Sequence, residues 1–124
     1  MAERLTEEER QALLPVLGEA GWGADPEADA LRKIWKFRNF SEAWAFMNRV
    51  ALLAEKRNHH PDWRNVFNVV DLRLTTHDCG GLSKLDTDMA AVIDKYAGAA
   101  EVQRDQAEEI VCLCQVRHPG TPAS

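Results

Sequence analysis

SEAWAFMNRVALLAEKRNHHPDWRNVFNVVDLRLTTH, residues 41–77, holds a helix and a strand pair whose order sets the architecture of the chain. Apolar residues at helical spacing predict a helix that begins at the N-cap Ser41 and ends near Arg57. From Val66 to Thr76 the side chains alternate with period two, which predicts β structure with Val66, Val70, Leu72 and Leu74 on one face. Asn68 interrupts that apolar face and indicates a tight hairpin in place of one long strand.

The residues before this stretch predict one helix and one strand. Thr6 and Glu9 form a capping box, and the helix they begin ends near Gly18 and Gly21. Pro15 lies inside that helix, where it would kink the chain or move the helix start. Residues 31–37 alternate imperfectly and predict a strand, with Leu31, Trp35 and Phe37 on one side.

The residues after it predict a third helix. Gly80 and Gly81 break the strand, and Ser83 with Asp86 is a second capping pair before the apolar positions Met89, Ala90, Ile93 and Ala97. The order of elements predicts an antiparallel sheet with helices on one face. The other face is half polar, so a self-associated assembly would suit it. Beyond Glu101 we expect a helix extension, then the apolar island 110–116 as a strand or interface segment, and a frayed end.

Size and composition indicate one soluble globular domain. The chain has 124 residues, a net charge of −5 and three cysteines. An acidic protein lacks the basic face that nucleic acid requires, and no apolar stretch approaches the ~20 residues that cross a bilayer. The first residues are acidic and unlike a signal peptide, and an odd cysteine count suits no disulfide framework. We therefore expect a cytoplasmic protein that binds neither nucleic acid nor membrane.

Two short clusters hold three of the four histidines. They are residues 55–63, with His59 and His60, and residues 76–81, with His77. An isolated histidine is more often a surface or core residue, but imidazole protons move readily near neutral pH, and three imidazoles at element ends suit general acid–base work on a neutral heterocycle. A zinc site with nearby carboxylates is a weaker alternative, and Cys79 as nucleophile is weaker still. Trp63 is either a core ring or a lid over a flat ligand.

The two clusters resemble a known family. Glu55-Lys-x-x-His59-His60-Pro61-x-Trp63, Asn65-Val-x-Asn68 and Leu74-x-Thr76-His77-x-Cys79-x-Gly81-Leu82-Ser83-x-x-Asp86 are similar to pterin-4a-carbinolamine dehydratases, and the likeness runs from about Leu5 to Ala100. It implies a two-layer α+β fold: a four-stranded antiparallel sheet with three helices packed on one face. It also implies edge-to-edge dimers that pair into tetramers. Residues 1–100 would be the single domain, and residues 101–124 an extension of unknown role.

The resemblance also implies a reaction. Members of the family dehydrate 4a-hydroxytetrahydropterin to quinonoid dihydropterin, and so recycle the cofactor of aromatic amino acid hydroxylases without a bound cofactor or metal. A histidine protonates the leaving 4a-hydroxyl and another removes the N5 proton; we favour His60 and His77 for proton transfer and His59 for positioning the hydroxyl. The implied catalytic set is His59, His60, His77, Glu55 and Asp86, the two carboxylates orienting a histidine and favouring its protonated form. The implied pterin contacts are Asn58, His59, His60, Pro61, Trp63, Thr75, Thr76, His77 and Asp78.

The sequence departs from the family at a few positions and leaves two other functions open. Asn58 stands where animal members carry Asp, while Asp62 and Asp78 stand for Glu. The first alternative is a non-catalytic module that binds a transcription factor's dimerisation domain. The second is a metal hydrolase built on the three histidines.

Overall fold

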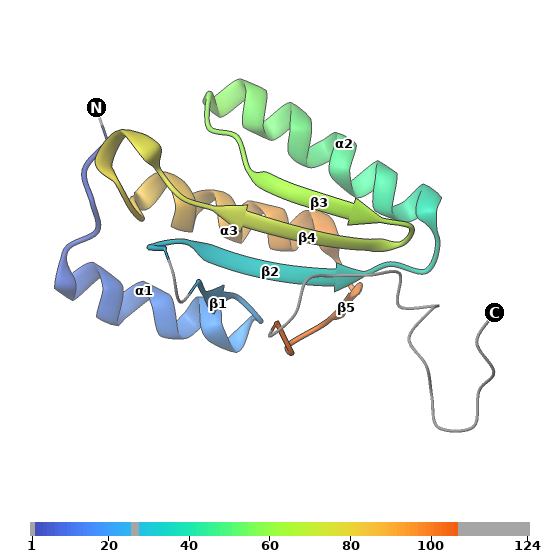
Figure 1. Cartoon of the computed structure of the whole chain (residues 1–124), viewed down its shortest axis with the longest axis horizontal. Coiled ribbons are helices and arrows are strands. Elements are labelled where there is room, and N and C mark those ends of the chain that lie inside the picture. Colours follow the sequence, from blue (N-terminus) through green and yellow to red (C-terminus); the bar gives the residue numbers. More distant parts are fainter. Residues whose placement is uncertain (1, 26–27, 107–124) are drawn as a thin grey trace.

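The computed structural model describes residues 2–25 and 28–106 (Figure 1). In chain order the elements are α1 (Glu7–Glu19), β1 (Gly23–Ala24), β2 (Leu31–Lys36), α2 (Phe40–Arg57), β3 (Asp62–Val66), β4 (Val69–Leu74), the short 3-10 helix η1 (His77–Cys79), α3 (Lys84–Ala97) and β5 (Glu101–Val102).

The strands form one antiparallel sheet in the order β1–β2–β4–β3, with β5 also paired to β2. The sheet and the three helices make two layers, and the α+β prediction is confirmed. β5 adds a fifth short strand to the four that were expected.

The hairpin predicted at Asn68 is present between β3 and β4. Phe67 has a positive φ of 50° and Asn68 is buried, with its side-chain amide donating to the carbonyl of Phe37 at 2.7 Å. Because the turn is this short, Val66 pairs with Val69. Val66 therefore lies on the opposite sheet face from Val70 and Leu72, and its predicted face was wrong. The turn shifts the parity of the alternation by one residue.

All three helices contribute to the main core on one side of the sheet. Trp35 of β2 and Leu72 of β4 are almost fully buried there against Val50 of α2 and Ile93 of α3, and Leu17 of α1 belongs to the same cluster. Alternate strand residues point to this side, as period two requires. The core thus fixes where α2 and α3 end relative to the sheet edge, which is where the histidine clusters lie.

The helix starts follow the capping signals, with one shift. The capping box at Thr6 and the N-cap at Ser83 are both present. α2 begins two residues earlier than predicted, because the side chain of Asn39 accepts from the backbone N–H of Glu42 at 2.9 Å. Asn is as good an N-cap as Ser, so the expected N-cap Ser41 was wrong.

The chain after α3 differs from the expected helix extension. Gly98 has φ 58° and ends the helix, and β5 then pairs antiparallel with β2. Glycine adopts this left-handed conformation without the Cβ penalty of other residues, so the helix extension was wrong. The apolar island 110–116 and the frayed end lie outside the described residues, and the division at Ala100 stays a prediction. Within the described part of the chain, no helix combines the length and apolarity that a bilayer span requires.

Candidate active site

The end of α2 positions the first two histidines. Asn58 is in the left-handed conformation, and the N–H groups of Asn58 and His59 bond to the carbonyls of Glu55 and Ala54. This is a Schellman ending, in which Asn is tolerated more readily than most residues because its short polar side chain suits the left-handed region. The chain turns sharply there, so His59 is buried while His60 is exposed.

A buried hydrogen-bond cluster holds His59. Its Nε2 lies 2.6 Å from Oδ1 of Asp86, a carboxylate with no solvent exposure. The other oxygen of Asp86 accepts from the Thr76 hydroxyl at 2.7 Å and from the Ser83 N–H at 3.0 Å. Asp86 therefore caps α3 and fixes the His59 ring at the same time. With Nε2 engaged, Nδ1 is the ring nitrogen of His59 left for a ligand.

The end of β4 positions the third histidine. Thr76 bridges to Gly81 through two backbone hydrogen bonds, and His77 is the first residue of η1 between them. Gly80 ends η1 with φ 72°, and a Cβ on Gly81 would collide with the carboxylate of Asp29. Both glycines are needed for this tight loop, one for its conformation and one for the close approach. His77 is exposed at the loop tip.

Asp29 ties the His77 loop to α1. Its carboxylate pairs with Arg10 at 2.6 Å and accepts from the Leu82 N–H at 2.9 Å, while its backbone carbonyl accepts from the Thr75 hydroxyl at 2.8 Å. The hydrogen bond from Arg10 holds the pKa of Asp29 well below its usual range, against the opposing effect of partial burial. Sequence reasoning missed this residue, which precedes β2 in an unremarkable acidic segment and carries no local signal.

These elements enclose a cavity of about 390 Å³ into which all three histidines are brought together. Its volume is within the usual range for small-molecule sites. Eight of its ten lining residues have polar side chains, and no positively charged Lys or Arg belongs to them, which suits an uncharged polar ligand. The lining residues are Asn58, His59, His60, Pro61, Asp62, Thr75, Thr76, His77, Asp78 and Leu85.

Three of the site residues named from sequence lie outside this lining. Asp86 is buried behind His59, and Glu55 is exposed on α2, with its carboxylate 3.2 Å from Nε2 of His60. Both touch a histidine, as expected. Trp63 is partly buried against the main core, and the structure does not bring it together with the histidines. Its contact with a pterin stays a prediction. Of the two alternatives given for Trp63, a ring in the core is the one that matches its position.

Two lining residues were not assigned to the site from sequence. Asp62 follows Pro61 directly, and the sequence analysis named it as a position where Asp stands for the family's Glu, not as a site residue. Leu85 lies in the first turn of α3, one residue before Asp86, and is 40% exposed. Leu85 could have been found from Asp86. If the first turn of α3 lies beside the histidines, the neighbours of Asp86 in that turn lie beside them too.

The described residues favour acid–base chemistry over a zinc site and over Cys79 as a nucleophile. The described ranges contain no group of three or more His, Cys, Asp or Glu side chains placed to hold a metal ion. The thiol of Cys79 donates to the carbonyls of Thr76 and Gly81, which is a structural role. Two exposed imidazoles and one anchored imidazole around one cavity provide groups that give, take and position protons.

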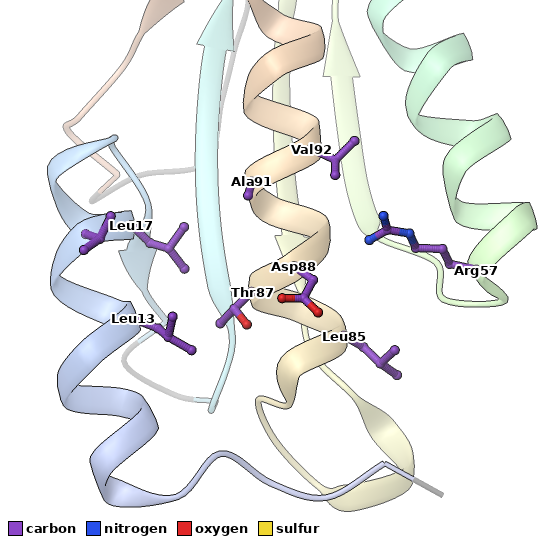
Figure 2. Close-up of a pocket in the computed structure, with 9 residues that line it drawn as sticks. Leu13, Leu17, Arg57, Leu85, Thr87, Asp88, Ala91 and Val92 are labelled. Atoms are coloured by element: carbon purple, nitrogen blue, oxygen red, sulfur yellow. The ribbon is translucent and has the colours of Figure 1, made fainter.

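A second depression, of about 650 Å³, lies over the outer side of the helices (Figure 2). Leu13 and Leu17 of α1, Ala91 and Val92 of α3, and Arg57 at the end of α2 line it. The remaining lining of this apolar groove includes the polar residues Thr87 and Asp88, and none of the three site histidines belongs to it. Leu85 belongs to both linings and separates the two sites.

Comparisons with known proteins point to one family. The sequence model of the family described as pterin 4 alpha carbinolamine dehydratase matches residues 3–96. A relative from Rhodopseudomonas palustris (strain HaA2) is 49% identical over 98 residues, which cover 79% of this chain and 95% of the relative. One from Bradyrhizobium sp. (strain BTAi1 / ATCC BAA-1182) is 48% identical over 99 residues, covering 80% and 98%. Both carry the provisional name pterin-4-alpha-carbinolamine dehydratase.

Solved structures give the same fold. A transcriptional coactivator/pterin dehydratase from Brucella melitensis superposes with a TM-score of 0.72 at 42% identity, covering 77% of this chain and all of that one. A pterin dehydratase-like protein described as a RuBisCO assembly factor in the alpha-carboxysome has a TM-score of 0.56 at 24% identity, covering 63% and 90%. The second likeness concerns the fold alone.

Proposed function

Since the chain belongs to the pterin-4-alpha-carbinolamine dehydratase family, we propose that it is a hydro-lyase acting on 4a-hydroxytetrahydropterin. The reaction releases the 4a-hydroxyl as water and yields quinonoid dihydropterin. One proton goes to the departing hydroxyl and one leaves N5, so the step is balanced by proton transfer alone. It needs no oxidant, no reductant and no bound cofactor.

The observation that carries the proposal is the convergence of His59, His60 and His77 on one cavity. A leaving hydroxyl and an N5 proton require an acid and a base within hydrogen-bond reach of the same flat ring. Imidazoles serve as both near neutral pH, because their unperturbed pKa lies close to it. The absence of Lys and Arg from the lining residues fits a neutral pterin ring.

The positions of the three rings suggest a division of work. His60 and His77 are exposed, so their nitrogens are available for proton transfer. His59 is anchored by Asp86 at 2.6 Å and is suited to position the hydroxyl. Glu55 lies 3.2 Å from His60, where it would orient that ring, but both side chains are well exposed and the pair is weak.

The wider setting follows from the same proposal. The enzyme would recycle the tetrahydropterin used by an aromatic amino acid hydroxylase, in the cytoplasm. We further propose that it works as a homodimer or homotetramer, as members of the family do.

A dehydration assay tests the proposed function. Freshly generated 4a-hydroxytetrahydropterin is mixed with the protein, and formation of the quinonoid product is compared with the spontaneous rate. We expect acceleration by the wild type and an equal rate for Val16→Ser, a variant in the apolar groove of Figure 2 that Val16 of α1 also lines. We expect a large loss of rate for His77→Ala in the cavity. No acceleration by the correctly folded wild type would overturn the proposal.

A second candidate function is protein binding, because the Brucella relative is described as a transcriptional coactivator as well as a pterin dehydratase. The observation that favours it is the apolar groove over α3, bordered by Val16, which is 64% exposed. Under this alternative the groove would take a helical dimerisation segment of a transcription factor. Val16→Glu would then abolish co-purification of such a partner and leave dehydration unchanged.

A further inference from the structure

The sheet face turned away from the main core carries a small apolar cluster of its own. Ile34 of β2 is 1% exposed and Val69 of β4 is fully buried, with Val66 of β3 packed against them. All three belong to strands, whereas the helices contribute to the other cluster. An uncovered sheet face leaves its side chains in contact with water, so burial this complete requires a cover.

A buried ion pair lies on the same face. Arg32 and Asp71 form two parallel hydrogen bonds of 3.0 and 2.7 Å, and their side chains are 10% and 7% exposed. Asp71 is the register partner of Ile34, so the ion pair and the apolar cluster adjoin. The region that is shielded from water therefore spans the centre of the sheet.

The described chain ends at this face. After β5 the N–H of Gln103 donates to the carbonyl of Ile34 at 2.9 Å, which continues the path along β2. The carbonyl of Gln106, the last described residue, accepts from Nη1 of Arg32 at 2.6 Å. The Arg32 side chain lies on the sheet face turned away from the main core, called the second face below. Residue 107 and those after it therefore begin beside the region of that face that needs a cover.

The sequence that follows has the length and pattern of a covering strand. Residues 107–109 (Ala-Glu-Glu) lead to the apolar island Ile-Val-Cys-Leu-Cys-Gln-Val at 110–116. Three extended residues span about 10 Å, roughly two strand spacings, so the island reaches β4 and β3 from the edge of β2. The glutamates of the spacer also complement Arg64 and Arg73, which share this face by register.

We infer that residues 110–116 pack intramolecularly on the second face of the sheet and cover Ile34, Val69 and Val66. With period two, one side of the island consists of Ile110, Cys112, Cys114 and Val116, and the other side includes Gln115. The wholly apolar side faces the sheet, and both cysteines are therefore shielded. The C-terminal segment completes the fold of the dehydratase domain, and the occupant of this face is the same chain.

Thiol reactivity tests this inference in the full-length protein. The aromatic disulfide reagent DTNB is added to the native chain, and the labelled cysteines are assigned by peptide mass. We expect Cys112 and Cys114 to react at least ~100-fold more slowly than in a free peptide of residues 107–124, because reaction requires the segment to detach. Equal rates in the protein and the peptide would overturn the inference.

A matched pair of variants and a dilution series complete the test. Ile110→Asp places a charge on the inward side and should raise the reaction rate of both cysteines at least ~10-fold, whereas Gln115→Asp on the outward side should change nothing. Circular dichroism of both variants confirms that the domain remains folded while the cysteines are labelled. Protection that is the same at every protein concentration supports an intramolecular cover. Protection that disappears on dilution would assign the face to a second copy and refute the inference. Equal effects of the two variants would show that the segment has no side packed on the sheet, and would refute it as well.

Discussion

Replacing Asp86 with asparagine removes the charge beside His59 and leaves the size of the side chain almost unchanged. Oδ1 of Asp86 holds Nε2 of His59 at 2.6 Å, and Oδ2 accepts from Thr76 and Ser83. The amide of asparagine has one acceptor oxygen, which the Thr76 hydroxyl and the Ser83 N–H occupy, and it presents an N–H donor to His59 in place of the carboxylate that accepts from a protonated Nε2. The variant therefore loses the charged acceptor that holds a protonated His59 ring, while the cavity keeps its shape.

The cost of this change follows from the contacts that are lost. A hydrogen bond to a charged group contributes about 1.5–3 kcal/mol, and the two remaining bonds weaken by about half when their acceptor becomes neutral. We expect the free energy of unfolding to fall by about 3 kcal/mol, which a domain of ordinary stability survives. We expect kcat to fall by ~100-fold, because loss of alignment at a reacting centre has effects of this size.

Ser83→Ala is the matched control for this experiment. It removes the N-cap contact to Leu85 N–H and the hydroxyl contact to Thr76, at a cost of about 1 kcal/mol, and leaves the His59–Asp86 contact in place. Urea unfolding gives the stability of each variant, and the dehydration assay gives kcat. A wild-type kcat for Asp86→Asn, or an equal loss in Ser83→Ala, would refute the role of Asp86 as the residue that positions His59.

Other expectations follow from the same structure. His60→Ala and His77→Ala should each slow dehydration by at least ~100-fold, the scale of a lost general acid or base, and wild-type rates in both would remove them from the mechanism. Glu55→Ala should reduce the rate far less in the same assay, because its contact with His60 is exposed. Asp29→Asn should lower the free energy of unfolding at pH 7 by about 2 kcal/mol. Since the pKa of Asp29 is lowered by folding, this stabilisation is present above about pH 4 and is lost as the pH falls, so urea titrations of variant and wild type should converge in acid. Truncation after Ala100 should lower the stability but leave kcat of the folded protein intact, because none of the described residues 101–106 lines the cavity, and a large loss of kcat would contradict this.

Features that depend on a few consecutive residues were predictable from the sequence. The capping boxes at Thr6 and Ser83, the hairpin at Asn68 and the two histidine clusters are local signals, and the structure contains each of them. The histidines also carried a functional signal, because uncommon polar residues gathered at the ends of regular elements. The histidine clusters alone pointed to His59, His60 and His77, and the resemblance to the family that they carry implied five more of the ten residues that line the cavity.

Features that depend on distant contacts were not predictable in this way. Asp29 anchors the His77 loop through Arg10 and Leu82, which are far from it in sequence. The face of Val66 depended on a one-residue difference in turn length, which reverses every side chain beyond it. To predict β5, one would have to know that part of the edge of β2 was free to pair with residues 101–102. The spacing of apolar residues and the helix-capping residues carry no information on which distant segments come into contact.

The placement of the pterin among the three histidines is tested most directly by nuclear magnetic resonance of the imidazole rings. The wild-type protein is titrated with 7,8-dihydropterin, a stable analogue, and the ring signals of His59, His60 and His77 are followed. We predict that all three shift together and saturate at one ligand concentration, with no change at Leu13 and Val16 in the helix-side groove. Saturable binding that shifts the groove signals and leaves the histidine rings unmoved would contradict the account.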